Sequence, residues 1–74
     1  MTNTELEIML DAATYLGAYH QPPPSGTEKA VTWWMEAAKD ISAIVTKWDN
    51  HPLATAVLIS VYGYLEEKAK AVAF

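Results

Sequence analysis

Three consecutive prolines at residues 22–24 determine where helices can run in this chain. A proline lacks the backbone N–H donor that a helix interior needs, and it restricts the residue before it to extended conformations. No helix continues through this tripeptide, so residues 20–26 are predicted to form a proline-rich connector. A fourth proline, Pro52, is typical of the first position of a helix, with Asn50 or His51 as its N-cap. The prolines thus divide the 74 residues into three segments.

The first segment has the periodicity of an amphipathic helix. Its apolar side chains fill an arc of roughly 220° on a helical wheel, which is wider than one neighbouring helix covers. The pairs Thr2/Glu5 and Thr4/Glu7 are overlapping capping boxes, in which a hydroxyl and a carboxylate satisfy the free amides of a helix start. These features predict a helix over about residues 4–19.

The second and third segments are longer. In residues 26–48 the polar side chains share one arc of about 120°, and Ser25 with Glu28 supplies a further capping box. Residues 53–65 carry no charged side chain. This stretch is too short to span a bilayer, which needs about twenty residues, and its lack of two-residue alternation favours a helix over a strand. We therefore predict helices over about 26–48 and 52–72.

These helices predict an all-α fold in a single domain, residues 1–74. The short turn between the second and third helices indicates an antiparallel hairpin, on which the N-terminal helix packs. The chain is 51% hydrophobic and only 19% charged. The apolar surface of three such wide arcs is larger than one small core can bury. Large apolar patches that stay exposed usually mark interfaces. We therefore expect a second copy to complete the bundle as a homodimer.

Small residues on the third helix suggest where helices could approach closely. Ala56, Ser60 and Gly63 recur at four- and three-residue steps, beside Ile59. Gly63 in mid-helix destabilises the helix by about 1 kcal/mol relative to alanine, so close packing at this point would explain its presence. These four residues are the predicted site of dimerisation or close helix packing.

The tryptophans supply the candidate binding surface. Trp33 lies at the boundary between the apolar and polar arcs of the second helix, whereas Trp34 and Trp48 lie within the apolar arc. Trp33 is therefore predicted to stay partly exposed, and tryptophan is enriched at interface hot spots. The predicted partner-binding residues are Trp33, Tyr15, Tyr19 and Tyr62. Core packing is one interpretation of the other two tryptophans. The alternative is a ligand pocket lined by Trp34, Trp48 and Tyr64.

Composition argues against several functions. A chain without cysteine has no disulfide, thiolate zinc site or cysteine nucleophile. Five lysines without an arginine, in a chain of net charge −4, argue against nucleic-acid binding. No motif for a cofactor or for catalysis is found, so neither cofactor nor enzymatic activity is expected.

A metal site is not expected either. His20 and His51 fall at opposite ends of the second helix, about 30 Å apart at 1.5 Å per residue. The carboxylate pairs Glu7/Asp11 and Glu36/Asp40 could serve acid–base or di-metal chemistry, but they lie in the polar arcs. We expect these four carboxylates to be solvated.

A non-enzymatic protein-interaction module, a regulator or inhibitor of another protein, is the function that these features favour. The chain is short, acidic and without cysteine, and it is predicted to be helical. In this general character it is similar to accessory inhibitors and regulators of phages and mobile elements. A small-ligand-binding helical dimer is the alternative function. Residues 1–7 lack the basic and apolar regions of a signal peptide, so a cytoplasmic location is expected.

Overall fold

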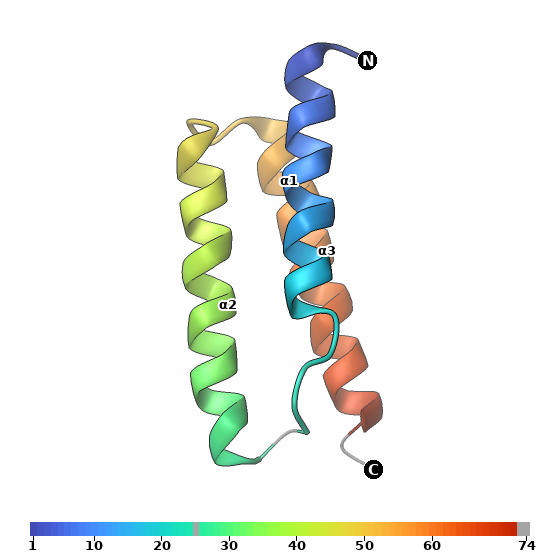
Figure 1. The fold of residues 1–74 in the computed structure, drawn as a ribbon, viewed down its shortest axis with the longest axis vertical. Coiled ribbons are helices and arrows are strands. Elements are labelled where there is room, and N and C mark those ends of the chain that lie inside the picture. The colour runs from blue at the N-terminus through green and yellow to red at the C-terminus, as the bar shows by residue number, and fades with distance from the viewer. Residues whose placement is uncertain (25, 73–74) are drawn as a thin grey trace.

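The computed structural model describes residues 1–24 and 26–72, and it confirms the all-α fold (Figure 1). Its helices are α1 (Asn3–Tyr19), α2 (Glu28–Lys47) and α3 (Pro52–Val72). Helices α2 and α3 form the antiparallel hairpin, and α1 packs on both. No described helix is long and apolar enough to cross a membrane.

Helix α1 begins one residue earlier than predicted because only the first of the two capping boxes forms. The backbone N–H of Thr2 donates to Glu5 Oε1 over 2.7 Å, and the backbone N–H of Glu5 donates to Thr2 Oγ1 over 3.1 Å. The hydrogen bonds from Thr2 lower the pKa of the Glu5 carboxyl below its ordinary value. Thr2 is therefore the N-cap of α1.

Helix α2 begins two residues later than predicted. Its N-cap is Thr27, whose Oγ1 accepts the backbone N–H of Ala30 over 3.2 Å and donates to the carbonyl of Pro24 over 2.9 Å. Gly26 has φ +86°, a left-handed conformation that no helix can include and that favours glycine. The predicted cap, Ser25, lies outside the described residues.

The turn between α2 and α3 is closed by two left-handed residues, Asp49 (φ 55°) and Asn50 (φ 57°). Both residue types tolerate this conformation better than most. His51 Nδ1 then accepts the backbone N–H of Leu53 over 3.1 Å, so His51 acts as the cap of α3. Pro52 occupies the first helical position, as predicted.

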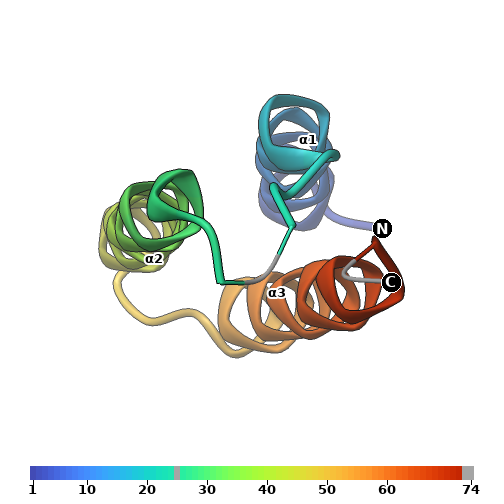
Figure 2. The same cartoon turned by 90° about the horizontal axis from the view of Figure 1, so that it is seen from below.

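The core lies where α1 and α2 face α3. Leu58 and Leu65 of α3 and Ile8 of α1 are the largest fully buried side chains. Alanines of all three helices are buried beside them and let the helix axes approach: Ala12, Ala30, Ala37, Ala54 and Ala69. Helix α1 packs more extensively on α3 than on α2, and an end view shows α1 and α2 standing apart on the side away from α3 (Figure 2).

Candidate protein-interaction site

Five aromatic rings form a continuous row that joins the three helices. Neighbouring ring centroids are 4.8 Å apart for Tyr15 and Tyr19, 5.3 Å for Tyr19 and Trp33, 4.7 Å for Trp33 and Trp34, and 5.3 Å for Trp34 and Tyr62. The last three contacts are edge-to-face, an arrangement that the ring quadrupoles favour. The row holds Trp33 in place between two other rings.

Tyr15 is the buried end of this row, and its placement corrects the prediction that it contacts a partner. The side chain is only 3% exposed, and its hydroxyl donates to the carbonyl of Ala37 over 3.0 Å. Burial raises the pKa of the Tyr15 phenol above its ordinary value. Tyr19, Trp33 and Tyr62 are half-buried and keep part of their surface accessible. A helical wheel could not separate Tyr15 from Tyr19, because both lie within the same wide apolar arc.

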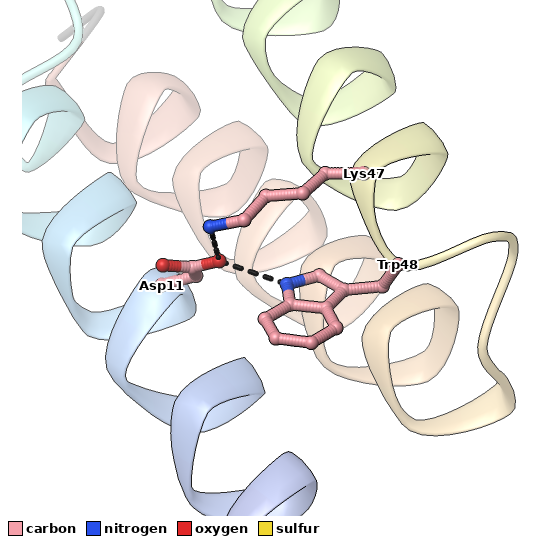
Figure 3. Close-up of polar contacts among 3 residues, drawn as sticks. All are labelled: Asp11, Lys47 and Trp48. Carbon is pink, nitrogen blue, oxygen red and sulfur yellow. Dashed lines mark hydrogen bonds and ion pairs between the residues drawn. The ribbon is translucent and has the colours of Figure 1, made fainter.

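Two aspartates link α1 to α2, and neither is simply solvated as expected. Asp11 Oδ2 accepts from Lys47 Nζ over 2.9 Å and from Trp48 Nε1 over 2.8 Å (Figure 3). The bond from Lys47, supported by that from Trp48, lowers the pKa of Asp11. Asp40 accepts from the Tyr19 hydroxyl, and this bond raises the pKa of Tyr19 to about 12.

A groove runs between α1 and α2, past both of these links. Its largest cavity, about 740 Å³, lies beside Tyr19 and Trp33. A second cavity of about 310 Å³ also borders Tyr19 and reaches Asp11, and a third of about 360 Å³ continues from Asp11 to Trp48. We call this continuous surface the α1–α2 groove. It is lined by five carboxylates and two lysines: Glu7, Asp11, Glu28, Glu36, Asp40, Lys29 and Lys47.

A second, uncharged surface lies across α2 and α3. A cavity of about 340 Å³ is lined there by Ala38, Ile41, Ile59 and Tyr62. Ile59 is 62% exposed, and Met35, one helical turn before Ala38, is 69% exposed. We call this surface, with Val31 and the small residues of α3 at its edges, the α2–α3 face.

The predicted small-residue strip lies on the surface of α3. Ala56 and Ser60 are exposed, and a Cβ added at Gly63 would meet no atom of another helix within 4 Å. Close helix packing at Gly63 inside one chain is therefore wrong. The strip and Ile59 are accessible to a second molecule.

The alternative ligand pocket is not assembled. Trp34 lines a cavity with Tyr62 and Lys70, whereas Trp48 lines the end of the α1–α2 groove. Fourteen residues separate these tryptophans along α2, about 21 Å at 1.5 Å per residue. Tyr64 is 55% exposed. One small ligand cannot contact both indoles at this separation.

The histidines have local roles at helix ends. His20 Nδ1 lies 2.9 Å from the carbonyl oxygen of Gly17 at the end of α1, and His51 caps α3. The described part of the chain has no group of three His, Asp or Glu side chains placed to hold a metal ion.

Comparison with known protein families, with curated proteins and with solved structures finds no match to this chain. The two surfaces are therefore the basis for a functional proposal.

The Asp11 link predicts a pH-dependent contribution to stability. Replacing Asp11 with asparagine should lower the free energy of unfolding by about 1 kcal/mol at pH 7, a modest value because the Lys47 side chain is 59% exposed and screened by water. Since folding lowers the Asp11 pKa, this stabilisation is present above the unfolded pKa of about 4 and is lost as the pH falls through the lower folded value.

Urea denaturation of the wild type and the Asp11→Asn variant at pH 7 and at pH 3 measures this effect. The difference between the two proteins should shrink at pH 3. The exposed Glu7→Gln, which removes a carboxylate one turn away, is the control and should shift the midpoint little at either pH. An equal effect of Asp11→Asn at both pH values would contradict a role for the charged carboxylate.

Proposed function

We propose that this chain is a non-enzymatic protein-interaction module, a regulator or inhibitor that binds another protein along the α1–α2 groove. The observation that carries this proposal is that two partly exposed aromatic side chains, Tyr19 and Trp33, line the largest cavity of the groove. Tryptophan and tyrosine are the residue types that most often dominate binding energy at interfaces. The edge-to-face contacts on either side of Trp33 hold its ring before a partner arrives, which lowers the entropy lost on binding.

We further propose that this chain is an accessory regulator of the kind that phages and mobile elements encode. The resemblance in general character to accessory regulators of phages and mobile elements supports a role exerted by binding rather than by catalysis. We also propose that it acts in the cytoplasm, a compartment whose reducing conditions do not affect a chain without cysteine.

Homodimerisation through the α2–α3 face is the second part of the proposal. Val31, Met35 and Ile59 are each more than 60% exposed on this face. If two α3 helices pair antiparallel, the turn before α3 in one copy, with its exposed Asp49, lies at the same end of the pair as Lys70 of the other. This charge complementarity favours a second copy over an unrelated apolar partner.

The groove is tested by replacing Trp33 with alanine. Tagged wild-type chain purified from its native host should retain a protein at near-stoichiometric yield. The Trp33→Ala variant should bind that protein about 30-fold more weakly, because removing a hot-spot side chain costs about 2 kcal/mol or more. Tyr64→Ala removes an aromatic ring that is 55% exposed and lies outside the groove, and this variant should bind as the wild type does. Equal capture by the Trp33→Ala variant, or no stoichiometric partner of the wild type, would contradict the proposal.

A further inference from the structure

The arrangement of the helices leaves room for a fourth helix. Both α1 and α2 pack on α3, and they stand apart on the side away from it (Figure 2). A helix lying along this side would contact both α1 and α2. It would occupy the remaining corner of a four-helix bundle, in which each helix packs against two neighbours.

The residues along the α1–α2 groove suit such a helix. Small side chains lie on both walls, with Thr14 and Ala18 on α1 and Thr32 and Ala43 on α2. Thr14 and Ala18 lie about one turn apart on α1, and Thr32 and Ala43 lie about three turns apart on one face of α2. At these positions the walls leave recesses for larger side chains. Ile44 and the Tyr19–Trp33 pair provide apolar surface between these recesses.

The charges of the groove indicate the composition of its occupant. Five carboxylates and two lysines give the lining a formal charge of −3. Asp11 and Asp40 already accept hydrogen bonds across the groove. Glu28 and Glu36 are exposed at the rim of the largest cavity, and within the described residues neither has an ion-pair partner. A cationic occupant complements this rim, whereas an acidic one is repelled.

We propose that a single amphipathic helix of the partner lies along the α1–α2 groove, with apolar side chains over Trp33 and Tyr19 and lysine or arginine side chains paired with Glu28 and Glu36. This inference rests on the proposed function and names the chemistry of the segment that the groove receives. The module thereby completes a four-helix bundle with its target.

A pair of synthetic helices tests the inference. The first carries leucine at heptad core positions, alanine elsewhere in the apolar stripe, and lysine along both flanks. The second has glutamate in place of every lysine. Titration into the full chain, followed by tryptophan fluorescence and by amide chemical shifts, should show tighter binding of the lysine helix by at least about 10-fold. The shifts should centre on Ala18 and Thr32 rather than on Ser60.

Matched variants separate specific pairing from general attraction. Glu28→Gln with Glu36→Gln should weaken binding of the lysine helix about 3- to 10-fold, the effect expected for two partly exposed ion pairs. Glu66→Gln with Glu67→Gln makes the same change in net charge on α3, outside the groove, and should leave the affinity within about 2-fold. Equal losses in both double variants, equal binding of the two peptides, or shifts centred on the α2–α3 face would overturn the inference.

The peptide titration and the Trp33→Ala experiment can fail independently of each other. If the native partner binds through Trp33 but the lysine helix does not bind in the groove, the proposed function is supported and the inference that the groove receives a cationic helix is wrong. If the lysine helix binds there but no native protein depends on Trp33, the groove chemistry stands and the proposed function is wrong.

Discussion

Replacing Leu58 with alanine is expected to lower the free energy of unfolding by about 2–5 kcal/mol, the range measured for leucine deletions in protein cores. Leu58 is completely buried, and it belongs to the cluster that Ala12, Tyr15, Ala37 and Leu65 form across the three helices. Because its neighbours include alanines, few side chains can move to fill the cavity. A domain of this length has a total stability of roughly 4–11 kcal/mol, so the loss is a large fraction of the whole.

Urea denaturation followed by circular dichroism measures this loss, and Leu10→Ala is the matched control. Leu10 lies on α1 and is 57% exposed, so the same deletion should change stability by less than about 1 kcal/mol. If the two variants shifted the midpoint equally, Leu58 would not lie in the core of the folded chain. A loss at the upper end of the range of about 2–5 kcal/mol would leave the Leu58→Ala variant unfolded. In that case Leu58→Met, which nearly conserves the side-chain volume, should remain folded.

The helix bounds could be read from the sequence to within two residues because local chemistry sets them. Pro52 starts α3 and the Thr2/Glu5 box starts α1, since each satisfies or removes free amides without help from distant residues. Local chemistry offers two starts for α2. Ser25 and Thr27 both supply a hydroxyl, and the left-handed Gly26 decides in favour of Thr27.

The contacts between helices could not be read in this way. Asp11 and Asp40 fall in the polar arcs of their own helices, and nothing local shows that a neighbouring helix brings Lys47, Trp48 or Tyr19 to them. A helical wheel gives directions within one helix, but the distance between two wheels depends on how the core packs.

The width of an apolar arc also leaves open which part of it is buried. Ile8 and Leu10 both belong to the apolar arc of α1, yet Ile8 is fully buried and Leu10 is mostly exposed. Likewise, α3 buries Leu58 and exposes its neighbour Ile59. Since α1 and α2 cover only one side of α3, the remaining apolar surface stays uncovered in a single copy. The expectation of a dimer depends on this surface.

Replacing Ile59 with lysine is expected to raise the dissociation constant of the homodimer by about 100-fold or more. In a symmetric pair the substitution occurs twice, near the axis on which the two α3 helices cross. An uncompensated charge held in an apolar interface costs about 3–5 kcal/mol, and each 1.4 kcal/mol is a tenfold change in affinity. Within one chain the position is 62% exposed, so the lysine should leave the folded monomer intact.

Light scattering and sedimentation over a range of concentrations measure this equilibrium, with circular dichroism to confirm folding. Leu10→Lys places the same charge on an exposed leucine of α1, away from the α2–α3 face, and should leave the dimer unchanged. Lys70→Glu should weaken the dimer by a smaller factor, and pairing it with Asp49→Lys should restore part of the loss if the two residues meet across an antiparallel α3 pair.

A wild-type chain that stays monomeric at tens of micromolar would contradict self-association. An Ile59→Lys dimer as tight as the wild type would instead place the interface elsewhere, and the exposed apolar residues of α1, Leu6, Met9 and Leu10, would then be the surface that remains to be covered.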